Sequence, residues 1–295
     1  MTGDIQHDKD GRMKKKEGRD RVEDIRLIAA DLDGTLLNAD SEVSSRTAEV
    51  LKRAKEAGVI LAAATGRPYD SLPETVRSSE SIEYAITSNG SGIYHMRGRK
   101  RLYANTMSMD TVERLLKLLA EYPCPLEVYI DGTPYAESRY LEDPAAYGLS
   151  VRSAEYVKAT RHACDDIPAL LHDHADCVDG IDIVETDQQL KDEIRARARD
   201  IPDLYITASL SHYLEFAAGS VSKETALREL VRMLGIERSQ VMCFGDGEND
   251  SEMLQYAGTG VAMGNASEQL KDLADRITES NLEDGVARAI ERWVL

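Results

Sequence analysis

The sequence contains no apolar run long enough to cross a membrane. Of its 295 residues 42% are hydrophobic, yet no stretch approaches the roughly 20 consecutive apolar residues that a membrane span requires. Residues 1–20 also lack the apolar centre of a signal peptide. These absences predict a cytoplasmic protein that does not bind membranes.

Positive charge and cysteine pairs are also scarce. The chain has 36 Lys plus Arg against 53 Asp plus Glu, a formal net charge of −17, which repels phosphate backbones and disfavours a nucleic-acid partner. The cysteines show no C-x-x-C spacing, which argues against a disulfide framework and against a thioredoxin-like pair. We expect reduced thiols at Cys124, Cys164, Cys177 and Cys243.

Three apolar strands are predicted in the first third of the chain, after a charged segment. Residues 1–21 have almost no apolar content and are expected to form a solvated, flexible tail. The strands predicted at 24–30, 59–64 and 84–87 each end in small polar residues and glycine. Parallel strands gather such ends at one edge of a sheet, where open α/β proteins bind ligands.

The middle of the chain follows a different pattern. Hairpin signals flank Gly98 and Gly132, helical stretches lie around them, and together they predict an α+β insertion over residues 92–209. The strand–helix alternation resumes with the apolar run LEFAA. The predicted fold class is therefore α/β: a Rossmann-like parallel-sheet core formed by residues 22–91 and 210–295, with the inserted α+β domain between them.

Acidic residues cluster at two of the predicted strand ends. Asp31 and Asp33 stand two apart, and the period of two in a strand points both to the same side, so their carboxylates would share one small space. Asp246 and Asp250 bring more negative charge to the same edge. A hard divalent cation resolves this repulsion, and Mg²⁺ fits an oxygen-only ligand set. The alternative is that each aspartate only caps a turn, but two clusters beside glycines favour the metal.

Three further residues suit a phosphate. Thr65 with Gly66, and Lys223 at the first turn of a predicted helix, supply a hydroxyl, backbone N–H groups and a cation. Lysine is a poor match for the positive end of a helix dipole, so a bound anion would explain its position. In the alternative interpretation Thr65 is a simple cap and Lys223 is solvated.

The chain from about Arg26 to its C-terminus resembles the haloacid dehalogenase superfamily, and within it the Cof-type phosphatases. Four motifs carry the resemblance in the family's order: DLDGT from Asp31, ATGR with Thr65, VSKETAL with Lys223, and GDGENDSEML with Asp246 and Asp250. The resemblance implies a Mg²⁺-dependent phosphatase that hydrolyses a small phosphorylated metabolite, such as a sugar phosphate. It also implies that the insertion is the α/β cap of this subgroup.

The resemblance assigns roles to the acidic residues. Asp31 would be the nucleophile that forms an aspartyl-phosphate, and Asp33 would be the general acid and base. Asp31, the backbone carbonyl of Asp33 and Asp246 would hold Mg²⁺, with Asp250 in support.

The resemblance also assigns the phosphate contacts, which would come from Thr65, Lys223 and Asn249. One position departs from the subgroup, because Glu224 stands where glycine usually follows the motif lysine. An anion at this position would weaken the hold of Lys223 on phosphate or bias the choice of substrate.

Two other patterns compete weakly with this interpretation. The histidines and cysteines between His162 and Cys177 offer metal ligands, but their spacing matches no usual zinc site. Ser220 and Lys223 fit an S-x-x-K acyl-transfer pattern whose companion triplets are absent.

Two rival functions stay closer to the resemblance. A phosphomutase would use the same aspartyl-phosphate with another acceptor, and a regulator would bind a phosphometabolite without turnover. Intact Asp31 and Asp33 argue against the regulator, because a binding protein gains nothing from two repelling carboxylates. The sequence leaves open the oligomeric state and the substrate, for which the candidate selecting residues are Tyr129, Tyr135, His95 and Arg139.

Overall fold

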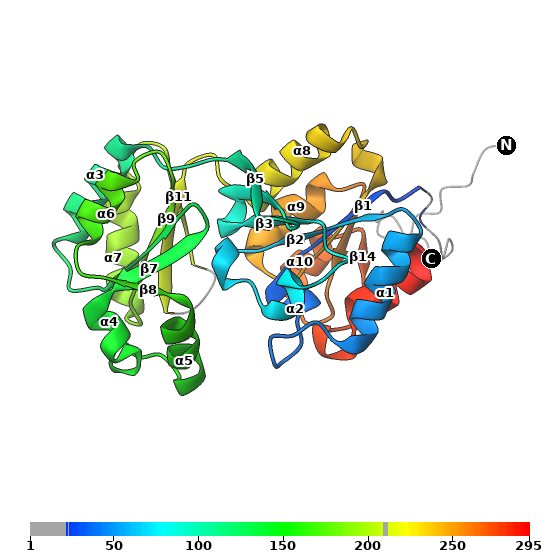
Figure 1. Ribbon diagram of the computed structural model, residues 1–295, viewed down its shortest axis with the longest axis horizontal. Coiled ribbons are helices and arrows are strands. Elements are labelled where there is room, and N and C mark those ends of the chain that lie inside the picture. Colours follow the sequence, from blue (N-terminus) through cyan, green and yellow to red (C-terminus); the bar gives the residue numbers. More distant parts are fainter. Residues whose placement is uncertain (1–21, 23, 209–211) are drawn as a thin grey trace, which may run out of the picture.

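The computed structural model describes residues 22, 24–208 and 212–295, so the predicted tail over residues 1–21 lies outside the described part. Two mixed sheets form two domains that lie side by side (Figure 1). The core sheet has eight strands in the order β14-β13-β12-β1-β2-β3-β4-β5, and the cap sheet has six in the order β10-β11-β9-β6-β7-β8. The predicted α/β fold class is confirmed.

The core sheet is parallel from β14 to β3 and is completed by the antiparallel strands β4 and β5. Its strands are β1 (Leu27–Ala30), β2 (Ile60–Ala64), β3 (Tyr84–Thr87), β4 (Gly92–His95), β5 (Lys100–Ala104), β12 (Val241–Gly245), β13 (Thr259–Ala262) and β14 (Arg276–Ile277). The central strands are apolar and buried on both faces, as a parallel sheet between helices requires.

Helices cover both faces of the core sheet. They are α1 (Ser45–Glu56), α2 (Glu74–Arg77), α8 (Lys223–Leu234), α9 (Ser251–Tyr256), α10 (Glu268–Leu273) and α11 (Gly285–Trp293). Side chains of α1 and α11 pack into the apolar cluster on one face, and side chains of α8, α9 and α10 pack into the cluster on the other. This layering leaves the strand ends as the open edge of the core domain.

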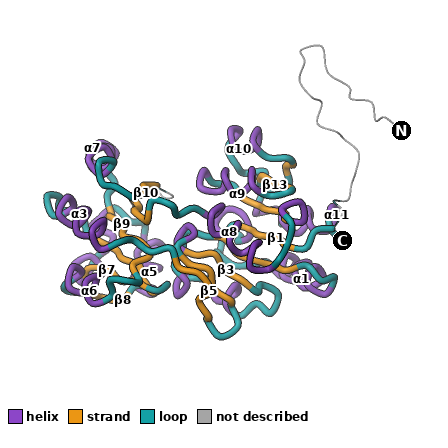
Figure 2. The backbone as a smooth tube through the Cα atoms, turned by 90° about the horizontal axis from the view of Figure 1, so that it is seen from above, coloured by secondary structure: helices purple, strands orange, loops and turns teal. Residues whose placement is uncertain are grey.

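The cap sheet has helices packed on both faces. Its strands are β6 (Leu126–Ile130), β7 (Thr133–Glu137), β8 (His162–Cys164), β9 (Val178–Val184), β10 (Leu204–Thr207) and β11 (Tyr213–Ala218). Its helices are α3 (Met109–Leu119), α4 (Ser138–Glu142), α5 (Val151–Thr160), α6 (Ile167–Asp173) and α7 (Gln188–Ala198). Helices α3, α6 and α7 share one apolar cluster with the sheet, and α3 and α6 lie at the end of the molecule away from the core in both views (Figure 1 and Figure 2).

Strand pairing corrects the predicted limits of the insertion, 92–209. Strands β4 and β5 join the core sheet next to β3, whereas β11, which contains LEFAA, pairs with β9 and β10 in the cap sheet. The hairpin signal of β4 and β5 is local and does not say which sheet the hairpin joins. The apolar run of β11 is buried on both faces and so resembles a core strand, but its partners lie far away in sequence.

The helices were compared with the length and apolarity that a membrane span requires. Within the described ranges, none of them is both long enough and apolar enough to cross a bilayer.

Candidate active site

The carboxyl ends of adjacent parallel strands bring the predicted acidic residues together. Asp31 follows β1 and Asp246 follows β12, and these two strands pair in register with Ala30 opposite Phe244. The backbone N–H of Asp31 continues this ladder by donating to the Phe244 carbonyl at 3.0 Å. Thr65 follows β2 on the other side of β1. The sheet edge therefore unites residues from three separate motifs.

Lys223 lies at the centre of this edge rather than in solvent. Its side chain is 1% exposed, and its Nζ donates to Asp31 Oδ1 at 2.6 Å and to Asp250 Oδ1 at 2.7 Å. Ser222 caps α8, because its hydroxyl accepts from the Thr225 N–H at 3.1 Å. The interpretation of Lys223 as a solvated residue is therefore wrong.

A glycine makes room for the start of α8. Gly90 has a φ of +113°, and a Cβ at this position would collide with the carbonyl of Ser222. Any larger residue would therefore be strained in its backbone and would also displace the end of the helix that carries Lys223.

Burial and charge set the protonation of this edge. Burial raises the pKa of Asp31 above its ordinary value, Lys223 lowers it, and the neighbouring Asp250 raises it again. Burial alone would lower the pKa of Lys223, but Asp250 and Asp31 hold it above its ordinary value, so this lysine is charged. One cation does not neutralise the whole group of carboxylates, and further positive charge beside Asp31 would favour its ionised form.

The donor set fits a hard cation. Carboxylate oxygens of Asp31, Asp246 and Asp250 lie within 4.8 Å of one another, and in the described part of the chain this is the one group of three acidic, histidine or cysteine side chains so arranged. Asp246 is held by the Thr35 hydroxyl at 2.7 Å and by Asn265 Nδ2 at 3.3 Å. Burial raises the pKa of Asp246, which a bound cation would reverse. Oxygen ligands of this kind suit Mg²⁺.

The contacts of Asp250 hold neighbouring residues of the site in place. Its Oδ2 accepts the backbone N–H groups of Asp246 at 3.1 Å and Gly247 at 3.0 Å, while its Oδ1 faces Lys223. Asp250 therefore shapes the turn after β12 and positions both Asp246 and the lysine.

The side chain of Asp33 lines the same cavity as this group but is paired with Arg67. Its carboxylate is 54% exposed and forms a two-pronged ion pair with Arg67, at 2.6 and 2.7 Å. The predicted neighbourhood of Asp31 and Asp33 holds, because both line the same cavity and the charge of Asp33 raises the pKa of Asp31. Strand periodicity does not produce it, since the chain leaves the extended conformation at a turn over Leu32–Leu36. Gly34 permits this turn with a φ of +83°.

Arg67 is a site residue that the sequence reasoning missed, although it lies in the ATGR motif. Besides Asp33, its guanidinium donates to the hydroxyl of Tyr156 at 3.0 Å and to the Ser71 carbonyl at 3.3 Å. It also lies over the Tyr156 ring at 5.0 Å from the centroid. Tyr156 belongs to α5 of the cap, so Arg67 joins Asp33 to the cap domain.

Asn89 is a second missed residue, and it links the phosphate side of the site to the cap. Asn249 Nδ2 donates to Asn89 Oδ1 at 3.0 Å, and Asn89 Nδ2 donates to Glu215 Oε2 of cap strand β11 at 3.1 Å. Gly66 lies against this amide, since a Cβ there would be 3.2 Å from Asn89 Oδ1. The hydroxyl of Thr65 accepts from the Arg67 N–H at 3.1 Å.

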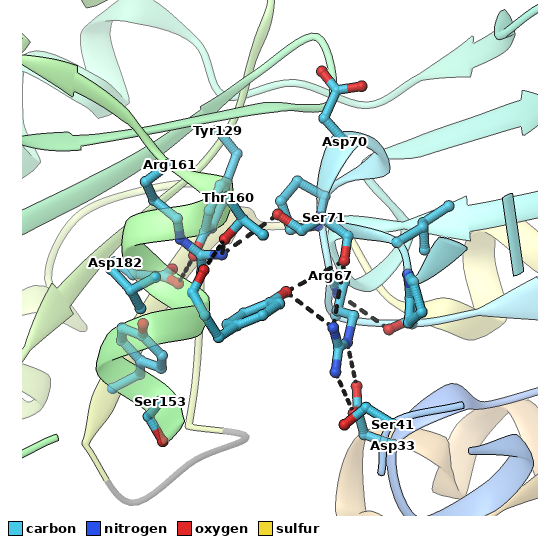
Figure 3. Close-up of a pocket in the computed structure, with 18 of the residues that line it drawn as sticks. Asp33, Ser41, Arg67, Asp70, Ser71, Tyr129, Ser153, Thr160, Arg161 and Asp182 are labelled. Carbon is cyan, nitrogen blue, oxygen red and sulfur yellow. Dashed lines mark hydrogen bonds and ion pairs between the residues drawn. The ribbon is translucent and has the colours of Figure 1, made fainter. Parts of the chain in front are cut away.

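A cavity of about 1060 Å³ lies between the domains and reaches the acidic edge. Figure 3 shows Asp33 and Arg67 on its core side and Tyr129, Arg161 and Asp182 on its cap side. Of the four residues proposed to choose the substrate, only Tyr129 lines it. Tyr135, His95 and Arg139 are not among the lining residues.

The competing patterns form no second centre. Among the described residues, the stretch from His162 to Cys177 does not bring three metal ligands together. Ser220 bonds to Asn105 at 3.0 Å, whereas Lys223 bonds to aspartates, so the S-x-x-K pattern makes no catalytic pair. All four cysteines are free thiols, as expected.

Glu224 does not face the acidic edge. Its carboxylate forms an ion pair with Arg228, one turn further along α8. The predicted weakening of Lys223 by this anion is therefore moderated by the charge of Arg228.

Comparison with known proteins identifies the family of the chain. Residues 28–290 match the model of the haloacid dehalogenase-like hydrolases. The chain is 32% identical over 272 residues to the 5-amino-6-(5-phospho-D-ribitylamino)uracil phosphatase YcsE of Bacillus subtilis (strain 168), covering 92% of this chain and 97% of that one. It is 30% identical to the HMP-PP phosphatase of Serratia proteamaculans (strain 568), covering 91% and 95%.

A solved structure shows the same fold. A haloacid dehalogenase-like hydrolase from Bacteroides thetaiotaomicron superposes with a TM-score of 0.77 at 32% identity, covering 91% of this chain and 99% of that one. The resemblance to Cof-type phosphatases is thereby confirmed. The chain belongs to the haloacid dehalogenase-like hydrolases and is an enzyme of the phosphatase branch of that family.

Proposed function

We propose that the protein is a Mg²⁺-dependent phosphatase that hydrolyses a small phosphomonoester with Asp31 as the nucleophile. One observation carries the proposal. The buried Asp31 carboxylate is held at 2.6 Å by Lys223, within reach of Asp246 and Asp250, at the edge that opens into the cavity. Phosphoryl transfer needs mainly positioning and charge stabilisation. A carboxylate nucleophile, a fixed cation and an oxygen-only metal site meet these needs.

Asp31, Asp246 and the Asp33 carbonyl would hold the metal, with Asp250 in support. Bound Mg²⁺ supplies charge neutralisation for the phosphoryl group and for Asp31. Lys223, already charged and buried, would contribute to the same neutralisation. Thr65 and Asn249, which both line the cavity, would contact phosphate oxygens.

The reaction would run in two displacements. A carboxylate oxygen of Asp31 attacks phosphorus, the bond from phosphorus to the leaving oxygen breaks, and Asp33 gives that oxygen a proton. Water then attacks phosphorus and passes a proton to Asp33, and the bond to Asp31 breaks. Asp33 is exposed to the cavity and held by Arg67, so it can meet both leaving group and water.

The substrate class follows from the relatives and the cavity. The two phosphatases named above act on phosphorylated small metabolites, and a cavity of about 1060 Å³ admits a leaving group of that size. We therefore expect a sugar phosphate or a similar phosphomonoester.

The test is Asp31→Asn, with hydrolysis of p-nitrophenyl phosphate and circular dichroism as the measurements. The amide fills the same volume but forms no acyl-phosphate, so a loss of at least ~10³-fold in turnover is expected. Asp40→Asn, the same change at an exposed residue of the cavity mouth, is the matched control. Turnover above a tenth of wild type in Asp31→Asn contradicts the proposal. An isomeric phosphate ester in place of inorganic phosphate from a sugar phosphate would indicate a phosphomutase.

A further inference from the structure

One tyrosine of the cap contacts the arginine that holds Asp33. Tyr156 lies on α5, and its hydroxyl accepts a hydrogen bond from Arg67 Nη1 at 3.0 Å. Nε and Nη2 of the same guanidinium form the two-pronged ion pair with Asp33, at 2.7 and 2.6 Å. Figure 3 shows Arg67 between Asp33 and Ser71. The proposed general acid and base is therefore linked to the cap through a single side chain.

The contacts on Nη1 fix the plane of the Arg67 guanidinium. Nη1 also donates to the Ser71 carbonyl of the core, at 3.3 Å. A guanidinium is planar and rigid, so its contacts on this side decide where Nε and Nη2 point. Tyr156 supplies the shorter of the two bonds, together with a ring whose centroid lies 5.0 Å from the guanidinium carbon. Without the tyrosine hydroxyl, only the longer bond to Ser71 would hold this side of the arginine.

Tyr156 is itself held in place. Its hydroxyl donates to the Ser71 carbonyl at 3.3 Å, and the Arg161 guanidinium lies 5.2 Å from the centroid of its ring. Arg161 is buried and is fixed by an ion pair with Glu127 at 2.7 Å. The tyrosine is therefore anchored within the cap and can hold Arg67 in one position.

The core segment that follows Arg67 is docked on the cap a second time. This segment contains the short 3₁₀ helix Tyr69–Ser71. The backbone N–H of Asp70 donates to the Gly132 carbonyl at 2.9 Å, and the Thr133 hydroxyl donates to the Asp70 carboxylate at 2.7 Å. Gly132 and Thr133 lie at the turn into β7 of the cap. Two separate parts of the cap thus contact the stretch of chain that carries Arg67.

Asp33 depends on Arg67 for its orientation. Its carboxylate is 54% exposed, and in the described part of the chain Arg67 is the one residue whose side chain bonds to it. When Asp33 is protonated, one oxygen can stay bonded to Arg67 while the other carries the proton toward the leaving oxygen. A carboxyl group without this support would rotate in the cavity and would be in the productive orientation less often.

We propose that Tyr156 is a positioning residue for proton transfer by Asp33 and that it acts through Arg67. The inference rests on the proposed phosphatase function and adds a cap residue to its mechanism. Because Tyr156 and Arg67 belong to different domains, Asp33 is fully positioned only when the cap lies on the core.

The test compares two aryl phosphates that differ in their need for an acid. p-Nitrophenolate is a weak base and leaves without a proton, whereas the phenolate of phenyl phosphate is a stronger base and benefits from protonation. The measured quantity is the ratio of kcat/KM for p-nitrophenyl phosphate to kcat/KM for phenyl phosphate, with saturating Mg²⁺. These values cover the steps up to phosphoryl transfer to Asp31, so the ratio reports on the proton given to the leaving group. A loss of folded enzyme or of phosphate affinity affects both esters and cancels.

Two variants test the link, and a third is the control. Tyr156→Phe keeps the ring and deletes the hydroxyl, and it is expected to raise the ratio at least about threefold, because only phenyl phosphate depends on the acid. Arg67→Lys keeps the charge but cannot form the two-pronged bond, so it should raise the ratio at least as much. Tyr147→Phe should leave the ratio unchanged, since Tyr147 packs against the same apolar cluster as Tyr156 but does not line the cavity.

Each outcome decides. A rise below about threefold in Tyr156→Phe, an unchanged ratio in Arg67→Lys, or an equal rise in Tyr147→Phe overturns the positioning role and leaves the phosphatase intact. Loss of a contact between Tyr156 and the nitro group would lower the ratio and so cannot imitate the expected result. Failure of wild type to hydrolyse either ester in Mg²⁺ overturns the proposed function itself.

Discussion

The core domain and the cap domain each hold a triad of carboxylates with a buried ion pair. The core triad is Asp31, Asp246 and Asp250, and the cap triad is Glu127, Asp182 and Glu215. Lys223 contacts two members of the core triad, whereas Arg161 contacts only one member of the cap triad. The buried lysine of the core is therefore shared by two carboxylates, whereas the buried arginine of the cap forms its ion pair with one.

The difference lies in the strand geometry that holds each triad. In the core, carboxylates follow the ends of parallel strands and converge within 4.8 Å, which suits a small cation. In the cap, they stand within antiparallel strands and form a row across the sheet. Carboxylates at converging strand ends can share one cation, whereas carboxylates in a row each need their own hydrogen-bond donor.

Metal removal should have the largest effect and should act through the core triad alone. EDTA is expected to abolish hydrolysis of p-nitrophenyl phosphate, Mg²⁺ to restore it, and Zn²⁺ not to restore it, because the ligands are all oxygens. Asp246→Asn should raise the Mg²⁺ concentration needed for half-maximal rate, whereas Glu215→Gln should not change it. Full activity in metal-free buffer would contradict the assignment of the core triad as a metal site.

Removal of the cap cation should cost stability. Arg161→Met leaves Glu127 buried without its charge partner, and the free energy of unfolding in urea is expected to fall by about 3 to 5 kcal/mol. The double variant with Glu127→Gln should recover most of this loss, since no unpaired charge remains. A loss below about 1 kcal/mol in the single variant would contradict the stabilising role of this ion pair.

Removal of the core cation should act on catalysis. Lys223→Ala deletes a charge-assisted contact worth about 1.5 to 3 kcal/mol, or roughly a tenfold to hundredfold loss in kcat/KM. Glu224→Gly removes an anion next to Lys223, so kcat/KM should rise, or stay unchanged because Arg228 already pairs with that anion. The variant should also lower helix stability, since glycine is a poor helix former. Lys52→Ala, an exposed lysine of α1, is the control. A Lys223→Ala variant equal to wild type would refute the assigned role.

The smallest expected effect is a gain in stability from the cap. The folded-state pKa of Asp182 is raised, so the unfolded chain loses this proton first as pH rises, and stability present at pH 4 is lost toward neutral pH. Asn at this position does not titrate and can still accept from Tyr129. Asp182→Asn should therefore exceed wild type by about 1 kcal/mol at pH 7.5 and by little at pH 4. An advantage that is absent at pH 7.5, or that shrinks as pH rises, would contradict the raised pKa.

The sequence was a good guide to the core triad. Asp31, Thr65 and Asp246 each follow an apolar strand, and parallel pairing then fixes their convergence. The anionic neighbours of Lys223 were also predictable, because a lysine at the positive end of a helix dipole is unfavourable unless a nearby anion stabilises it. Local pattern and fold agree at these positions.

The remaining features depend on contacts between distant parts of the chain. The orientation of Asp33 is set by a turn and by Arg67, and no periodicity encodes either. The neighbourhood of Asp182 and Glu215 comes from an antiparallel register, which a sequence pattern does not specify. For the same reason β11 was predicted in the core sheet rather than in the cap.

The most direct test of the central claim is to trap the phosphoryl group on the enzyme. Wild type with Mg²⁺ and a phosphate ester labelled in its phosphoryl group would be quenched in acid during turnover, digested, and searched for the labelled peptide. The label is expected on the peptide that contains Asp31 and should be absent from Asp31→Asn. Label on a different residue, or turnover by Asp31→Asn above a tenth of the wild-type rate, would contradict nucleophilic catalysis by Asp31.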